Sequence, residues 1–107
     1  MIVLKAKYLK NSLQKTVGLI GEKNPQTVYF NTRFGIHTFG VGFSIDVLVL
    51  SRENTIVKVK ENMHPNNVFF WNPIYDKVVE MPAGGVKKNK IKKGELVKLV
   101  LDHSLGG

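Results

Sequence analysis

Residues 43–50 constrain the fold of this chain more than any other segment, because apolar side chains occupy both faces of the strand that they predict. Successive side chains of a strand point to opposite faces, so Ile45, Val47 and Val49 share one face while Leu48 lies on the other. A strand at the surface of a sheet would leave one of these faces in water. The segment therefore predicts a central strand that is covered on both sides.

Most of the remaining chain predicts further short strands. Residues 55–60 alternate between apolar and polar side chains after a polar turn at residues 51–54, and they are expected to pair antiparallel with residues 43–50. Five more strands are expected, at residues 2–9, 27–30, 36–39, 77–81 and 96–101.

Helices are expected in only two places. Apolar side chains follow helical spacing within residues 11–20, and a second short helix is expected at about residues 86–89. Residues 63–75, with several prolines and asparagines, predict the longest irregular segment. The aromatic run at residues 69–71 either fills the core or forms an exposed platform.

Many short strands with few helical residues favour an α+β, mainly β fold. We expect one compact, barrel-like antiparallel β domain over residues 1–107, with one or two short helices. The length suits a single hydrophobic core. No apolar stretch is long enough to predict a membrane span, and no secretory signal pattern follows Met1, so the expected location is the cytoplasm. The absence of cysteine excludes disulfides and thiolate metal sites.

The charge balance gives the first indication of a partner. Sixteen Lys and Arg residues against eight Asp and Glu residues give a net charge of +8, which attracts polyanions. Only Arg33 and Arg52 are arginines, whereas nucleic-acid recognition favours arginine. The densest basic cluster, which we call the lysine-rich turn, contains Lys87, Lys88, Lys90, Lys92 and Lys93.

The lysine-rich turn has two interpretations. By itself it is a solvated loop. If it shares a face with the aromatic run, and with Trp71 above all, the two would bind single-stranded RNA or DNA through phosphate contacts and base stacking.

Several stretches, taken in order, resemble an uncharacterised prokaryotic family called domain of unknown function 192. Residues 36–40 (IHTFG) and 43–47 (FSIDV) resemble its His-Thr-Phe and Ile-Asp-Val core. Residues 79–84 (VEMPAG) are similar to its Leu-Glu-Leu-Pro-Ala-Gly motif, and residues 91–95 (IKKGE) to its closing turn. The resemblance covers about residues 13–101. It implies a compact, barrel-like β domain with small helices and does not imply an activity.

Asp46 is the most informative polar residue, because aspartate is disfavoured within strands and a buried, unpaired carboxylate costs several kcal/mol. One interpretation is structural: the carboxylate accepts hydrogen bonds from backbone amides of a glycine-rich turn near Gly40 or Gly84. The other is functional, with Asp46 as a general base, a partner that orients His37, or a metal ligand. The structural interpretation is favoured.

His37, Thr38, Asp46 and Gly84 form the candidate polar site. A His-Asp pair beside a hydroxyl could support a small hydrolase that uses Asp46 and His37. The sequence contains no Gly-x-Ser-x-Gly nucleophile elbow, however, so a structural histidine is favoured and no catalytic residue is assigned. The histidines and Asp46 show no close ligand spacing, so neither a metal nor a cofactor is predicted.

Three function classes remain in order of preference. The first is a small non-catalytic binding or interaction domain with an unidentified ligand or protein partner. The second is a binder of single-stranded RNA or DNA that uses the lysine-rich turn and the aromatic loop. The third is the small hydrolase.

Overall fold

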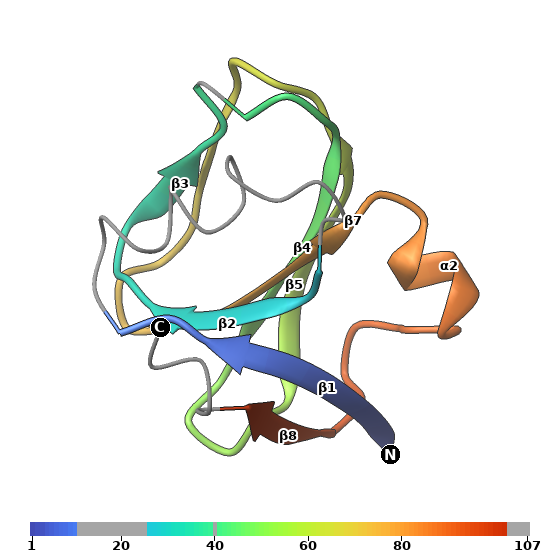
Figure 1. Ribbon diagram of the computed structural model, residues 1–107. Coiled ribbons are helices and arrows are strands. Elements are labelled where there is room, and N and C mark those ends of the chain that lie inside the picture. Colours follow the sequence, from blue (N-terminus) through green and yellow to red (C-terminus); the bar gives the residue numbers. More distant parts are fainter. Residues whose placement is uncertain (11–25, 40, 103–107) are drawn as a thin grey trace.

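The computed structural model describes residues 1–10, 26–39 and 41–102. These residues form eight strands and one short helix (Figure 1). In chain order the elements are β1 (Ile2–Tyr8), β2 (Val28–Asn31), β3 (Gly35–His37), β4 (Ile45–Leu50), β5 (Ile56–Met63), β6 (Val68–Phe70), β7 (Lys77–Pro82), α2 (Gly85–Lys88) and β8 (Val97–Asp102). The helix predicted at about residues 11–20 lies outside the described residues.

Six of the strands form one mixed sheet, in the order β5-β4-β7-β2-β1-β8. All six residues of β4 are buried, and β4 pairs antiparallel with both β5 and β7. The predicted central strand and its antiparallel partner are therefore confirmed. They place Asp46 in the middle of the domain.

The expectation of an entirely antiparallel sheet is wrong for β1. This strand pairs parallel with β2 on one side and with β8 on the other. Alternation of apolar and polar residues identifies a strand but does not encode its direction, which depends on the path of long connections. In the described part of the chain the sheet does not close into a barrel, because its edge strands meet only at a bridge between Thr55 and Leu96.

The two faces of this sheet carry two separate hydrophobic cores. The first core contains Leu48, Leu50 and Val79, and α2 and the segment after it cover it with Val86 and Ile91. The second core lies on the opposite face and includes Ile45, Val47, Val49, Phe30 and Trp71. Both faces of β4 are thus covered, as its sequence pattern requires.

The second core is covered by a two-stranded antiparallel ribbon formed by β3 and β6, here called the β3–β6 ribbon. Ile36 and Phe69 are register partners and pack against the second core. In Figure 1, β3 and α2 lie on opposite sides of the sheet. The short helix predicted at about residues 86–89 is confirmed as α2.

The prediction of an irregular segment at residues 63–75 is wrong in part, because β5 extends to Met63 and β6 occupies Val68–Phe70. The aromatic run is divided by the pleat of the chain. Trp71 is 6% exposed, whereas Phe70 is 64% exposed, so one ring fills the core and the other faces solvent. No helix in the described part of the chain is long and apolar enough to cross a membrane.

Trp71 should be the main contact that holds the β3–β6 ribbon on the sheet. Its ring lies in the second core, and its Nε1 donates a hydrogen bond to the Tyr75 carbonyl at 2.9 Å. We expect Trp71→Ala to lower the free energy of unfolding by about 3–5 kcal/mol in urea denaturation. Trp71→Phe keeps most of the apolar contact and should lose only about 1–2 kcal/mol. A loss below about 1 kcal/mol for Trp71→Ala would contradict this assignment.

Candidate functional site

The Asp46 carboxylate accepts hydrogen bonds from three backbone amides. Its Oδ2 accepts from Gly84 N at 3.1 Å and from Val86 N at 2.9 Å, while its Oδ1 accepts from Asn62 N at 2.8 Å. Asp46 is 1% exposed. The expected contact with a turn at Gly84 is present, whereas Gly40 lies outside the described residues.

The Asn62 contact depends on a bulge in β5. Ile45 pairs with Met63 and Val47 with Lys60, so two residues of β5 lie opposite Asp46. Asn62 has a φ of 53°, in the left-handed region that asparagine tolerates. A bulge of this kind redirects the backbone, and here its amide meets the Asp46 carboxylate.

The contact at the other oxygen fixes the start of α2. Gly84 is the N-cap residue and has no side chain with which to cap the helix. Asp46 supplies the missing acceptor, because Val86 N is one of the amides that an N-cap side chain normally binds. Gly84 has a φ of 97°, which favours glycine at this position. Asp46 and Gly84 therefore form one structural unit.

The contacts of Thr38 also indicate a structural role. It is fully buried, and its Oγ1 donates a hydrogen bond to the His64 carbonyl at 2.8 Å. The Asn67 backbone amide donates a hydrogen bond to Thr38 Oγ1 at 2.9 Å. These contacts tie the end of β3 to the loop before β6. The Thr38 hydroxyl proton is directed to a carbonyl, so it has no general base beside it.

His37 lies on the exposed side of β3. Its Nδ1 accepts a hydrogen bond from Phe39 N at 3.3 Å, and its ring stacks on Phe39 at a centroid distance of 5.2 Å. In the described part of the chain no hydrogen bond joins His37 to Asp46. The structure therefore brings Asp46 and Gly84 together but does not assemble a His-Asp-hydroxyl triad. The described residues also contain no group of three His, Cys, Asp or Glu side chains suited to a metal ion.

The structure places the lysine-rich turn in solvent and Trp71 in the core. Lys87 and Lys88 lie in the last turn of α2, where positive charge stabilises a helix, and Lys90, Lys92 and Lys93 follow in exposed positions. Trp71 is buried in the second core and offers little ring surface for stacking. If single-stranded nucleic acid stacks on this protein, the bases must therefore contact aromatic rings other than that of Trp71.

Glu80 is a buried carboxyl group that the sequence interpretation did not select. It is 4% exposed, its register neighbours on β2 and β4 are Val28 and Val47, and no hydrogen bond reaches its carboxyl from any described residue. Desolvation by burial raises the pKa of Glu80 from 4.5 to about 8. Alternation within β7 places Glu80 on the same face as Val78. This pattern is the feature of the sequence from which the burial of Glu80 could have been predicted.

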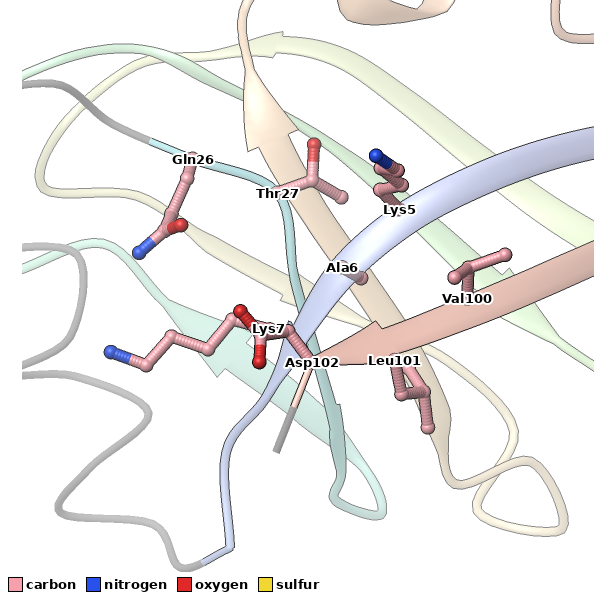
Figure 2. Close-up of a pocket in the computed structure, with 8 residues that line it drawn as sticks. All are labelled: Lys5, Ala6, Lys7, Gln26, Thr27, Val100, Leu101 and Asp102. Atoms are coloured by element: carbon pink, nitrogen blue, oxygen red, sulfur yellow. The ribbon is translucent and has the colours of Figure 1, made fainter. Parts of the chain in front are cut away.

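A hollow of about 520 Å³ lies beside β1, β8 and the start of β2 (Figure 2). Lys5, Lys7, Gln26, Thr27 and Asp102 provide its polar lining. Each of these side chains is exposed or half-buried. The hollow therefore has positive charge but lacks a buried polar group, among the described residues, that would orient a ligand.

The largest group of exposed apolar side chains lies on and around the outer face of the β3–β6 ribbon. Phe70 and Val68 are 64% and 49% exposed and lie opposite Gly35 and His37 in the register. A Cβ atom at Gly35 would come within 2.5 Å of Phe70 Cδ1, so the Phe70 ring lies over a residue without a side chain. Sequence reasoning missed this surface because it did not predict β6.

Three more exposed apolar residues lie next to the two strands in the chain. Phe34 directly precedes β3, while Phe39 and Ile74 follow β3 and β6, and they are 65%, 51% and 67% exposed. Phe34 has a φ of 75°, a left-handed conformation that is unfavourable for a bulky residue. Its carbonyl accepts a hydrogen bond from Trp71 N at 2.9 Å. The backbone is thus held in this conformation while the ring remains in solvent.

Comparisons with known proteins agree with the fold. The model of a family described as DUF192, Uncharacterized ACR, COG1430, matches residues 3–99. None of the curated proteins matches the chain significantly.

Two solved structures are similar. A protein of unknown function from Novosphingobium aromaticivorans DSM 12444 is 14% identical, with a TM-score of 0.68 over 86% of this chain and 70% of that one. A putative transcription regulator from Sinorhizobium meliloti 1021 is 20% identical, with a TM-score of 0.69 over 86% of this chain and 76% of that one. At these identities the likeness shows the fold alone.

Asp46 should be important for stability. Asp46→Ala leaves three backbone amides without their acceptor, and we expect it to lower the free energy of unfolding by about 3 kcal/mol or more. Asp46→Asn keeps one acceptor oxygen for the Gly84 and Val86 amides and should lose less. Urea denaturation measures both variants. Wild-type stability in Asp46→Ala would overturn the structural assignment.

Glu80 should make stability depend on pH. Because its pKa is higher in the folded protein, the folded state keeps a proton that the unfolded state releases between about pH 4.5 and pH 8. Stability should therefore fall by about 1.4 kcal/mol per pH unit across this range. Glu80→Gln should match the wild type near pH 4.5 and become more stable than it as the pH rises. Parallel urea-unfolding profiles of the two proteins would contradict the assignment.

Proposed function

The chain belongs to the DUF192 family of uncharacterised proteins, and we propose that it is a non-catalytic binding domain whose binding surface is the outer face of the β3–β6 ribbon. The observation that carries the proposal is Phe34. An exposed aromatic ring on a backbone in the left-handed region contributes little packing and costs conformational energy. A residue that weakens the fold in this way is expected where it contacts a ligand.

The concentration of apolar side chains supports the same surface. In the described part of the chain, five of the nine exposed large apolar residues lie on or beside the ribbon. Exposed apolar side chains that gather in one place mark interaction sites, whereas single ones are common on any surface. The five residues are Phe34, Phe39, Val68, Phe70 and Ile74.

The ribbon is also held firmly, which reduces the entropy lost on binding. Thr38 and the Asn67 backbone secure one end, where Thr38 N also donates to the Asn67 carbonyl at 2.9 Å. At the other end, Arg33 donates to the Pro73 carbonyl at 2.6 Å and Trp71 donates to Tyr75. The outer rings are therefore presented on a backbone that is fixed at both ends.

The polar site favours binding over catalysis. The acceptor oxygens of Asp46 are occupied by amides, and the Thr38 hydroxyl donates to a carbonyl. Both groups are thus engaged in hydrogen bonds with the backbone of neighbouring segments. This arrangement supports a structural role for both motif residues.

The proposal is tested first by stability. Phe34→Asn places a residue that tolerates left-handed φ at this position, so we expect unchanged or increased stability, by up to about 1 kcal/mol. Phe70→Ala should lose less than about 1 kcal/mol because its ring is mostly exposed. Phe30→Ala, in the second core, is the control and should lose about 3–5 kcal/mol. A loss above about 1 kcal/mol in Phe34→Asn would make Phe34 a structural residue.

A second measurement tests binding without assuming the ligand. Wild type and the double variant Phe34→Asn/Phe70→Ala are purified in parallel from the native cell, and retained components are identified by mass spectrometry. Leu96→Ala, an exposed apolar residue near β8, serves as the matched control. At least one component should be lost only from the double variant. Identical sets of components in all three proteins would contradict the proposal.

A further inference from the structure

The outer face of the β3–β6 ribbon presents aromatic rings in an arrangement suited to flat ligands. Phe70 and His37 lie on its outer side, and Phe39 extends the surface by stacking on His37 at an interplanar angle of 28°. Phe34 adds a further exposed ring next to β3. Aromatic side chains stack on any nucleobase, because every base has a π-face.

Positive charge lies beside the ribbon. Lys58 Nζ lies 3.3 Å from the Phe70 carbonyl oxygen and 5.3 Å from the centroid of the Phe69 ring. Arg33 is exposed and directly precedes Phe34. Lys60 follows Lys58 on the same face of β5, since both pair with residues of β4 that belong to the second core.

A hollow beside the second core brings Lys58 of β5 and Lys93 of the lysine-rich turn together. It has a volume of about 230 Å³, and its lining includes Lys58, Lys93, Asn72, Trp71 and Tyr75. Lys93 therefore lies close to the ribbon although the other lysines of the turn surround α2. Two ammonium groups at one hollow favour a phosphate or a carboxylate there.

The net charge of +8 favours an anionic ligand over a second copy of the chain as the binding partner of the ribbon. A second copy of the chain would bring the same positive charge to an interface that already holds several cations. A ligand that carries both rings and regular negative charge complements the rings and the cations together. In a duplex the bases are already paired and stacked, so only an unpaired strand presents base faces to the ribbon.

We propose that the ligand of this surface is single-stranded nucleic acid, with bases stacked on the outer rings of the β3–β6 ribbon and phosphates near Lys58, Lys93 and Arg33. This inference rests on the proposed function, because it assigns a ligand to the same surface. In this inference the bases stack on Phe34 and Phe70, and not on Trp71 as the sequence predicted. Contacts of this kind bind with little sequence preference.

Fluorescence anisotropy with short labelled oligothymidylate, oligouridylate and a DNA duplex of equal length tests the inference at low and physiological salt. Single strands should bind at least about tenfold more tightly than the duplex. Phe70→Ala and Phe34→Asn should each weaken single-strand binding by about 5- to 150-fold, the range expected for one lost stacking contact. Leu96→Ala should leave it unchanged.

The lysines are tested through the salt dependence. Lys58→Gln and Lys93→Gln should each lower the slope of log affinity against log salt by about 0.7, the value for one lost phosphate contact with a single strand. Lys98→Gln, which removes an exposed charge on β8 at the other end of the sheet, is the control and should leave the slope unchanged. Equal effects of all three substitutions would indicate nonspecific attraction and overturn the inference.

Two other outcomes separate this inference from the proposed function. If no oligonucleotide binds, or if polyglutamate displaces the strand as well as unlabelled oligothymidylate does, the ligand is not single-stranded nucleic acid. The proposed function still stands in that case if Phe34→Asn remains stable and the double variant loses a native component. If strands bind tightly but Phe70→Ala and Phe34→Asn have no effect, the strands bind elsewhere and this inference is wrong. The proposed function also fails if the double variant then loses no native component.

Discussion

The hydrogen bonds of the Asp46 carboxylate are the interaction on which the rest of the structure depends. One side chain in the central strand binds the bulge of β5 through Asn62 and the start of α2 through Gly84 and Val86. The carboxylate thus joins the backbones of β5 and of the turn before α2, which follow Asp46 by 16 and by 38 to 40 residues in the chain. Because a buried carboxylate must find donors, the position of Asp46 in β4 also determines where the two backbones must lie. The Ile-Asp-Val and Pro-Ala-Gly motifs are thus two halves of one contact.

Glu80, a second buried carboxyl group, shows by comparison how the amide contacts of Asp46 affect the fold. Asp46 and Glu80 both lie in central strands, but Asp46 shares the face of Leu48 while Glu80 faces the second core between Val28 and Val47. Three backbone amides donate hydrogen bonds to Asp46, whereas desolvation raises the pKa of Glu80. The same sheet therefore holds one carboxylate that strengthens the fold and one carboxyl group that weakens it as the pH rises.

Local patterns in the sequence could predict the part of the fold that depends on residues close in the chain. The two-sided apolar pattern of residues 43–50 identifies β4, and the turn that follows identifies its pairing with β5. The Gly84 turn was one of two glycine-rich turns that the sequence offered as a partner of Asp46, because backbone amides can satisfy a carboxylate in a strand. The parallel pairing of β1 depends on long connections that no local pattern encodes. The β3–β6 ribbon joins three-residue strands far apart in sequence, so its pairing left no signal in either strand alone.

The aromatic run shows why exposure was the hardest property to predict. Three consecutive rings are ambiguous by composition, but once they are extended, the alternation of a strand must place Phe69 and Trp71 on one side and Phe70 on the other. The second core accepts the first two rings, and the absence of a side chain at Gly35 leaves room for the third. The same pleat that fixes the ribbon to the sheet therefore directs Phe70 into solvent. Burial of Trp71 and exposure of Phe70 are two consequences of one strand, and this coupling gives the binding surface a rigid support.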